Sequence, residues 1–141
     1  MFITRASRRD ADEILEFYRG QQWDEDMDLS AGTALIARQG PIVGVVRLLE
    51  VAPQTVIVED LVVHKDHRRT GIGSQLMRAA MNSRGGTLFL SCHDDTVPFY
   101  QRFEFSERPF ESLPEPVQAH FRATGDYPSE PGHIHHFLTA R

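Results

Sequence analysis

The sequence contains a single cysteine, Cys92, among its 141 residues. One cysteine cannot form an internal disulfide bond, so the fold does not depend on a disulfide framework and the chain suits a reducing compartment. There is also no run of 18 apolar residues and no apolar stretch of the signal-peptide kind. We therefore expect a cytoplasmic protein with no membrane partner.

Positive charge is scarce as well. Fifteen lysines and arginines stand against twenty acidic residues, and the formal net charge is −5. Nucleic-acid-binding domains usually carry an excess of basic residues, so we expect no nucleic-acid partner. The apolar content of 40% and the charged content of 25% are ordinary for a globular protein. The length predicts that residues 1–141 form a single domain.

The most informative segment is Glu59–Met77, which reads EDLVVHKDHRRTGIGSQLM. The apolar residues Leu61–Val63 lead through a basic turn to two glycines, Gly71 and Gly73, which open a helical pattern. The first turn of a helix has unpaired N–H groups and a partial positive charge, so it attracts anions. Glycines let an anion approach the backbone, and arginines add charge-assisted hydrogen bonds. The segment therefore predicts a phosphate site.

Two familiar phosphate loops do not fit this segment. A dinucleotide-binding fingerprint needs a third glycine at position 76, where the chain has Leu76. A nucleotide P-loop needs Gly-Lys-Ser/Thr, which the chain does not contain. The remaining pattern, Arg68-x-x-Gly71-x-Gly73, resembles the acyl-CoA-binding signature of the GNAT N-acyltransferase superfamily, Arg/Gln-x-x-Gly-x-Gly/Ala.

A second element resembles the same family. Thr87–Cys92 reads as a buried strand, and the following Phe99–Phe105 is similar to the family's Phe-Tyr-x-x-x-Gly-Phe element. The resemblance implies that Tyr100 is the general acid that protonates the departing CoA thiolate. The family's glycine is replaced by Glu104. Glycine at a helix exit often has a positive φ, so the sequence leaves the geometry of this turn open.

The resemblance implies an α/β fold of the α+β type, with a mixed, mostly antiparallel twisted sheet of about six to seven strands and helices on both faces. Hydrophobic patterning agrees, and a Ser7-x-x-Asp10 capping box precedes the first helical pattern. The expected strands are Phe2–Arg5, Thr33–Arg38, Ile42–Glu50, Thr55–His64, Leu88–Ser91 and His133–Thr139. The expected helices are Ala11–Tyr18, Gly71–Asn82, a helix capped by Asp95 or Thr96 with Pro98 in its first turn, and a short helix near Val117–Arg122.

The resemblance further implies an enzyme that moves an acetyl group from acetyl-CoA to a primary amine by direct attack in a ternary complex. In the family, the fourth strand splays from its neighbour and offers backbone amides to the pantetheine arm and the acyl oxygen. The pyrophosphate lies on the amides that open the next helix, where Thr70 and Ser74 could add hydroxyl donors. The cofactor-binding residues implied here are Leu61, Val62, Val63, Arg68, Arg69, Thr70, Gly71, Ile72, Gly73, Ser74 and Phe99.

The general base is less defined. An alkylamine with a pKa near ~10.4 arrives protonated and needs a proton acceptor. Some relatives carry a glutamate eleven residues before the arginine of the motif, where this chain has Ile57. Glu59 lies two residues further on and shares the strand face of Ile57, so we expect it to act as base, directly or through water. Asp60 and His64, on the opposite face, and an ordered water are the alternatives, and a structural ion pair of Glu59 with Arg47 is the non-catalytic explanation.

The acidic segment Trp23–Asp28 falls where the family places its acceptor-binding loop. Carboxylates beside an aromatic ring attract a cationic amine, although a solvated loop is the alternative. We expect Trp23, Asp24 and Asp26, together with Asp60, to contact the acceptor. The acceptor would be a small-molecule or peptide amine. The sequence does not choose among an aminoglycoside, a polyamine, an amino sugar, an amino acid and a protein amine.

Three histidines near the end of the chain invite a metal-site interpretation. If His133–Thr139 is a strand, His133 and His135 share one face and His136 points away, so only two ligands align and we expect no metal cofactor. Exposed sheet edges would make a homodimer possible. The alternative function is a non-catalytic, acyl-CoA-binding regulatory domain.

Overall fold

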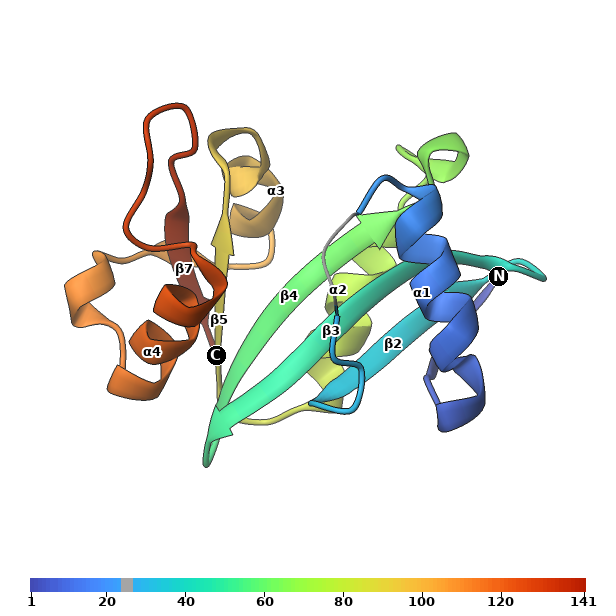
Figure 1. The fold of residues 1–141 in the computed structure, drawn as a ribbon, viewed down its shortest axis with the longest axis horizontal. Coiled ribbons are helices and arrows are strands. Elements are labelled where there is room, and N and C mark those ends of the chain that lie inside the picture. Colours follow the sequence, from blue (N-terminus) through green and yellow to red (C-terminus); the bar gives the residue numbers. More distant parts are fainter. Residues whose placement is uncertain (24–26) are drawn as a thin grey trace. The chain divides into compact units, whose positions relative to one another are not determined.

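A computed structural model describes residues 1–23 and 27–141 of the chain (Figure 1). The strands of this part are β1 (Phe2–Arg5), β2 (Thr33–Arg38), β3 (Ile42–Ala52), β4 (Thr55–Val63), β5 (Thr87–Cys92), β6 (Ser106–Glu107) and β7 (His136–Ala140). The α-helices are α1 (Ala11–Gly20), α2 (Ile72–Ser83), α3 (Val97–Gln101) and α4 (Glu115–Thr124). The strands form a mixed, mostly antiparallel sheet in the order β1-β2-β3-β4-β5-β7-β6. The predicted fold class is confirmed.

The described residues divide into two compact units. The first unit comprises Met1–Leu49 and Val58–Arg84, and the second comprises Glu50–Ile57 and Gly85–Arg141. Strands β3 and β4 therefore contribute residues to both units. The single domain expected for residues 1–141 remains a prediction.

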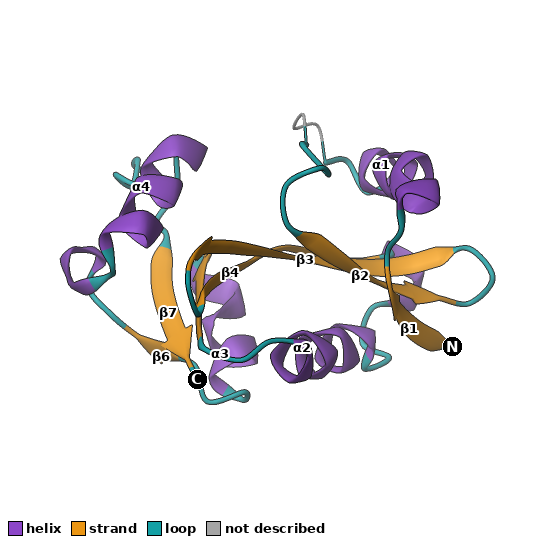
Figure 2. Ribbon diagram, turned by 90° about the horizontal axis from the view of Figure 1, so that it is seen from below, coloured by secondary structure: helices purple, strands orange, loops and turns teal. Residues whose placement is uncertain are grey.

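In the first unit, β1 pairs antiparallel with β2, and β2 with β3. Helix α1 covers one face of these strands and α2 the other (Figure 2). The predicted capping box is present: Asp10 accepts a hydrogen bond from the Ser7 amide at 2.7 Å, and helical spacing of apolar residues follows. The buried core on this side consists of Ile14, Phe17, Tyr18, Ile36, Ile42 and Val45.

Helix α2 packs very close to β3 at Gly44. A Cβ atom added to Gly44 would lie 2.9 Å from Leu76 Cδ1 and 3.1 Å from Ile72 Cγ2. Both contacts are tighter than ordinary van der Waals packing, and Ile72 and Leu76 are buried. The missing side chain at position 44 thus lets the first turns of α2 settle directly on the sheet.

In the second unit, Thr55–Ile57 of β4 pairs in parallel with β5, and β7 pairs antiparallel with both β5 and β6. Aromatic rings dominate the core, and the rings of Phe110 and Tyr127 stack almost parallel with centroids 3.6 Å apart. The core residues are Ile57, Phe89, Phe110, Leu113, Val117, Phe121 and Phe137.

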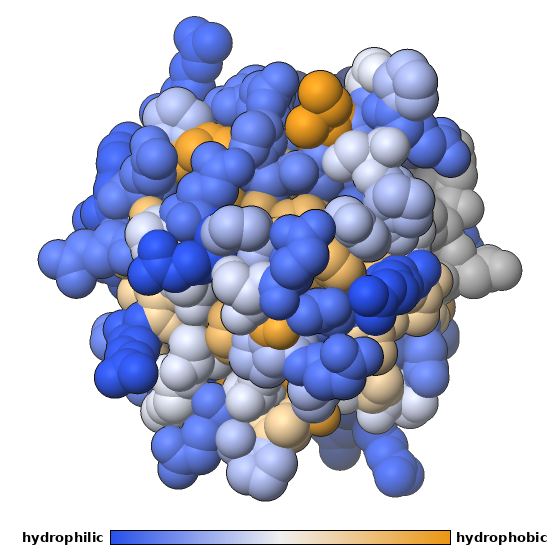
Figure 3. Space-filling model, turned by 90° about the vertical axis from the view of Figure 1, so that its left-hand side faces the viewer, coloured by the Kyte–Doolittle hydropathy of each residue, from blue (hydrophilic) through white to orange (hydrophobic). Residues whose placement is uncertain are grey.

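Figure 3 shows one face of the molecule, on which hydrophilic residues predominate and hydrophobic residues occur in small separate areas. Among the helices of the described residues, none combines the length and apolar character needed to cross a membrane. The possible homodimer remains a prediction.

Two predicted boundaries near the C-terminus differ from the structure. The helix expected near Val117–Arg122 begins at Glu115, because proline is favourable in a first helical turn, where no N–H partner is lost. Strand β7 begins at His136 instead of His133, since Gly132 has a positive φ and residues 130 and 133 form an isolated bridge. The expectation that His133 and His135 share a strand face is therefore wrong.

Candidate active site

Strand β4 changes character halfway along its length. Its ladder with β5 covers Thr55–Ile57, so Leu61–Val63 lie beyond that ladder. Asp60 has a left-handed backbone conformation with φ of 57°, which aspartate tolerates better than most residues. Its carbonyl accepts a hydrogen bond from the Tyr18 hydroxyl at 2.7 Å. Regular strand geometry is thus interrupted just before the three residues expected to offer amides to the co-substrate.

Arg47 of β3 joins two neighbouring carboxylates of β4. Its Nη1 lies 3.0 Å from Asp60 Oδ2 and 3.8 Å from Glu59 Oε1. Its Nη2 donates to the carbonyls of Asp28 at 2.7 Å and Ala31 at 3.3 Å. Arg47 is only 8% exposed, and a buried guanidinium is stable when its donors are satisfied in this way.

This cluster corrects one prediction about β4. A regular strand would place Glu59 and Asp60 on opposite faces. Both carboxylates reach Arg47, because the left-handed residue at position 60 breaks the alternation. The ion pair of Glu59 with Arg47, the non-catalytic explanation of this glutamate, is present in the structure. Arg47 nevertheless holds Asp60 at hydrogen-bond distance and Glu59 more loosely.

His64, a further candidate for the base, is used locally. Its Nδ1 accepts a hydrogen bond from the Asp66 amide at 3.1 Å and so caps the short 3-10 helix Lys65–His67. A nitrogen that already accepts a backbone proton is a poor acceptor for a substrate proton. This contact weakens the case for His64.

The basic turn before α2 contains two left-handed residues, Arg69 with φ of 63° and Gly71 with φ of 86°. A Cβ atom at Gly71 would meet nothing within 4 Å, so glycine is required there for its backbone conformation and not for space. Left-handed residues in a turn orient successive amides into a concavity that suits an anion. Arg68 folds back, and its Nε donates to the Val63 carbonyl at 3.4 Å.

One expected phosphate donor is engaged elsewhere. The Thr70 hydroxyl donates to the carbonyl of His67, so its proton is not free for a phosphate oxygen. The other residues named for the phosphate, Ile72, Gly73 and Ser74, form the first turn of α2.

Tyr100 belongs to α3 in the second unit. Its ring lies 5.0 Å from the Phe99 ring and 6.1 Å from the Phe105 ring, measured between centroids. Burial raises the pKa of Tyr100 above the ordinary phenol value, and the neighbouring Cys92 adds to the shift. A phenol with a raised pKa keeps its proton at neutral pH. Tyr100 can therefore act as a hydrogen-bond donor, while the raised pKa makes it a weaker acid than an ordinary phenol.

Glu104 replaces the family's glycine without changing the turn. Its φ is 67°, which is the left-handed conformation that a glycine would adopt at a helix exit. Its amide donates to the Gln101 carbonyl at 3.0 Å. The geometry left open by the sequence is thus retained, at a conformational cost of roughly 1–2 kcal/mol for a residue with a side chain.

The sequence did not predict a network around His136. Its Nδ1 lies 2.6 Å from Glu107 Oε2, and its Nε2 contacts Asp94 Oδ1. The hydrogen bond to Glu107, followed by that to Asp94, raises the pKa of His136. Burial raises the pKa of Cys92, its partner in the β5–β7 register, to about 11. The only sequence signal was a histidine at the start of an apolar strand.

Of the residues expected to contact the acceptor, Trp23 packs with its ring centroid 5.8 Å from that of Tyr18. Its Nε1 is buried and has no hydrogen-bond partner in the part of the chain that the structure describes. Asp24 and Asp26 lie outside the described residues. Within residues 1–23 and 27–141, no group of three or more His, Cys, Asp or Glu side chains could hold a metal ion.

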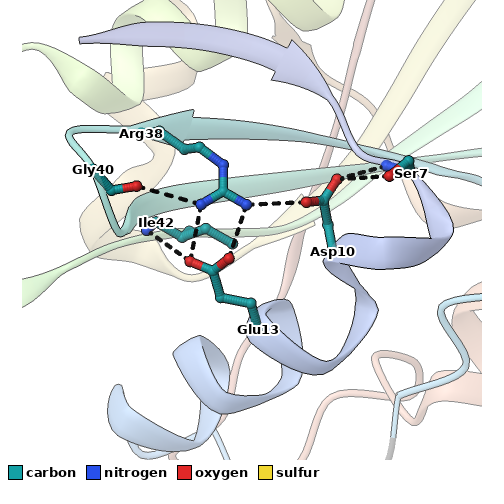
Figure 4. Close-up of polar contacts among 6 residues, drawn as sticks. All are labelled: Ser7, Asp10, Glu13, Arg38, Gly40 and Ile42. Carbon is teal, nitrogen blue, oxygen red and sulfur yellow. Dashed lines mark hydrogen bonds and ion pairs between the residues drawn. The ribbon is translucent and has the colours of Figure 1, made fainter.

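A second cluster of charges surrounds Arg38 (Figure 4). Its Nη2 lies 3.0 Å from Asp10 Oδ1 and 2.8 Å from Glu13 Oε1, and its Nη1 lies 2.9 Å from Glu13 Oε2. The bond to Arg38 lowers the pKa of Glu13, and the Ser7 amide, followed by Arg38, lowers that of Asp10. Glu13 also accepts from the Ile42 amide at 3.3 Å. The cluster ties α1 to the β2–β3 hairpin.

Comparison with known families agrees with this arrangement. The model of the acetyltransferase (GNAT) domain matches residues 30–107, and the chain belongs to this family. The matched range contains β4, the turn before α2 and Tyr100. A search among curated proteins finds no match.

Solved structures share the fold. A GNAT-family acetyltransferase from Staphylococcus aureus Mu50 is 18% identical with a TM-score of 0.67, and the match covers 98% of this chain and 96% of that one. An aminoglycoside 6'-N-acetyltransferase in complex with coenzyme A is 17% identical with a TM-score of 0.68, and 99% and 96% are covered. N-acetylglutamate synthase from Neisseria gonorrhoeae, in complex with coenzyme A and N-acetyl-glutamate, is 18% identical with a TM-score of 0.75. There, the match covers 100% of this chain and 35% of the synthase chain.

Proposed function

We propose that this chain is an acetyl-CoA-dependent N-acetyltransferase that acetylates a primary amine by direct attack in a ternary complex. One observation carries the proposal. A single continuous segment, Glu59–Gly73, joins a carboxylate pair, a strand end beyond the β5 ladder and a left-handed turn that opens α2. An acyl-CoA substrate needs these three features in this order: a group near the acyl carbon, amides for the pantetheine and a cradle for the pyrophosphate.

The pyrophosphate would bind to the amides of Arg69–Ser74, at the positive end of α2. The left-handed backbone conformations of Arg69 and Gly71 support this assignment, and the side chains of Arg68 and Arg69 supply permanent positive charge. The pantetheine arm would follow the amides of Leu61–Val63, and Phe99 would pack in the core or on the adenine side. The relatives crystallised with coenzyme A support acetyl-CoA as the co-substrate, and the proposal requires no metal.

The acceptor amine must lose a proton to become a nucleophile. Glu59 is our candidate for the acceptor of this proton, directly or through a water, because Arg47 holds it less closely than Asp60. The amine nitrogen then bonds to the acyl carbon, and the carbonyl electron pair moves onto oxygen. An amide of Leu61–Val63 would donate to that oxyanion.

Collapse of the tetrahedral intermediate re-forms the carbonyl and breaks the carbon–sulfur bond. The sulfur leaves with the bonding electron pair, and Tyr100 would donate to it, with its proton replaced from solvent. The raised pKa of Tyr100 keeps its hydroxyl protonated, so the hydroxyl can donate a hydrogen bond to the departing sulfur. The products are an N-acetylated amine and free CoA.

The test is release of the CoA thiol from acetyl-CoA in the presence and absence of a panel of amines. The panel contains amino acids, polyamines, amino sugars, an aminoglycoside and lysine peptides, since the acceptor class is open. We expect thiol release that depends on the amine and an acetylated product of matching mass. Tight binding of acetyl-CoA without amine-dependent release would instead support the non-catalytic regulatory domain. A cytoplasmic location remains a prediction.

A further inference from the structure

A pocket of about 420 Å³ lies in the first unit beside the start of α1. It is lined by residues 5–8, 11 and 14, by residues 29–34 ahead of and at the start of β2, and by Arg47. Nothing in the proposed handling of acetyl-CoA uses this space, since the phosphate turn and Leu61–Val63 are absent from its described lining.

The lining of this pocket is basic. Arg5, Arg8 and Arg47 contribute to it, and none of its described lining residues is acidic. This excess is local, because the whole chain carries a net charge of −5. Such a concentration of guanidinium groups favours an anion, above all a carboxylate, which accepts two parallel hydrogen bonds from one arginine.

Two of these arginines have no counter-ion among residues 1–23 and 27–141. The side chains of Arg5 and Arg8 form no hydrogen bond or ion pair with any residue that the structure describes, and both residues are exposed. Two acidic residues close to them in sequence, Asp10 and Glu13, are instead bound to Arg38 (Figure 4). Arg47 is paired with Asp60 and Glu59, so the positive charge that the pocket offers to a ligand is that of Arg5 and Arg8.

The rest of the lining is small and apolar, and it indicates the kind of molecule that fits. Apart from the arginines, Ser7, Ser30, Gly32 and Thr33, the walls are formed by Ala6, Ala11, Ile14, Leu29, Ala31 and Ala34. A ligand with an anionic group and a short apolar body would match both parts of this surface.

Arg47 connects the pocket to the candidate base. The same guanidinium that lines the pocket lies 3.0 Å from Asp60 Oδ2 and 3.8 Å from Glu59 Oε1. Because Arg47 belongs both to the pocket lining and to the Glu59–Asp60 cluster, a molecule with its amine at Glu59 would lie next to the pocket. We propose that the pocket binds the carboxylate of the acceptor, which is then an amino acid or another small amine that carries a carboxylate. This inference rests on the proposed function.

The first experiment compares matched acceptors. Thiol release is measured with the standard amino acids and γ-aminobutyrate, each beside its primary amide, and with O-phosphoethanolamine as the phosphate-bearing amine. We expect at least one carboxylate-bearing acceptor whose kcat/KM exceeds that of its amide by about tenfold to a hundredfold, the value of a charge-assisted hydrogen bond. Turnover that is equal for acids and amides, or confined to amines without a carboxylate, or best with the phosphate, would overturn the inference and leave the acetyltransferase proposal intact. Acetyl-CoA binding without turnover of any amine would overturn both.

The second experiment uses Arg5→Gln and Arg8→Gln, singly and combined, with Arg9→Gln as the matched control. Arg9 is an exposed arginine of the same segment that does not line the pocket. We expect the pocket variants to lower the preference for acid over amide by about tenfold, through KM, and the control to leave it unchanged. An unchanged preference in the double variant would contradict the inference, while unchanged melting temperatures and acetyl-CoA affinity would exclude a folding effect.

Discussion

The two compact units supply different kinds of chemical group. The first unit offers backbone amides and permanent charges: the left-handed turn before α2, the end of β4, and Arg47 with its carboxylates. Burial also raises the pKa of Tyr18 in the first unit, where its hydroxyl donates to the Asp60 carbonyl. The second unit has three side chains with a raised pKa. In it, burial raises the pKa of Tyr100 and Cys92, and hydrogen bonds to carboxylates raise that of His136.

This difference suggests a division of labour. Amides and arginines keep their polarity at every physiological pH, so they suit the binding of an anionic co-substrate. A phenol or an imidazolium changes charge only when its proton moves, so it suits a step in which a leaving group acquires a proton. Under the proposed function, changes in the first unit should affect binding and the nucleophile, and changes in the second should affect proton donation.

The largest effect is expected for Gly73→Leu in α2. A bulky side chain in the first turn would cover amides that the pyrophosphate needs, and the loss of two charge-assisted hydrogen bonds would weaken acetyl-CoA binding by about a thousandfold or more. Isothermal titration calorimetry measures this loss. Gly20→Leu is the matched control, because a Cβ atom at helical Gly20 would meet nothing within 4 Å. Unchanged affinity in Gly73→Leu would remove the phosphate site from this turn.

A smaller effect, on turnover alone, is expected for Glu59→Gln. At pH 7 only about one in 2,500 alkylamine molecules is neutral, so removing the base should lower kcat by about 10³ without changing acetyl-CoA affinity. Asp60→Asn is the comparison, since it removes the carboxylate that Arg47 holds at 3.0 Å. Loss of the Asp60 carboxylate should lower the melting temperature more than loss of the Glu59 carboxylate does. A larger loss of kcat in Asp60→Asn, with the fold intact, would transfer the role of base to Asp60.

The next effect tests the second unit. Tyr100→Phe removes the proposed donor, and kcat should fall by about 10² while acetyl-CoA affinity stays nearly unchanged. The effect should be smaller than that of Glu59→Gln, because a thiol with a pKa of about 8.5 leaves as an anion more easily than an ammonium loses its proton. Steady-state kinetics and calorimetry measure the two quantities. A wild-type kcat in this variant would show that Tyr100, the candidate donor in the second unit, takes no part in the reaction.

The sequence predicted most of the fold because local patterns determine most of it. The strands Phe2–Arg5 and Thr33–Arg38 have the predicted bounds, since alternating or apolar runs end at clear turn residues. The start of α2 was also predictable, because the two glycines and the helical pattern that follows them are local signals. Each of these predictions used only residues that are close together in the sequence.

Features that depend on distant residues were not predictable in this way. The carboxylates Glu59 and Asp60 reach the same guanidinium only because Asp60 is left-handed, and no neighbour in sequence requires that. The contacts of His136 with Asp94 and Glu107 arise from the register of β5, β6 and β7. Motif spacing locates a side chain along the chain, while its partners depend on tertiary structure.

A fourth prediction concerns the permanent charges of the first unit. Arg38→Gln should lower the free energy of unfolding by about 1 kcal/mol and leave kcat unchanged, since partly exposed ion pairs contribute little. The lowered pKa values of Asp10 and Glu13 stabilise the fold above the ordinary carboxyl range, and this contribution is lost as pH falls through their folded-state values. Urea unfolding should therefore show the variant and the wild type converging as pH is lowered below about 4. A difference that is constant with pH would show that Arg38 acts through packing.

The smallest effect is expected for the stability contribution of His136 in the second unit. Its dependence on pH should be opposite to that of the Arg38 cluster. Because the folded-state pKa of His136 is raised, its contribution to stability is complete below about pH 6.5 and is lost as pH rises through the folded-state value. Its partners Asp94 and Glu107 are largely exposed, so the contribution should stay below about 1 kcal/mol. His136→Gln should therefore be less stable than wild type at pH 6 and equal to it near pH 9, in urea unfolding curves. The exposed His133→Gln is the control, and a wild-type advantage that grew with pH would reverse the contrast between the two units.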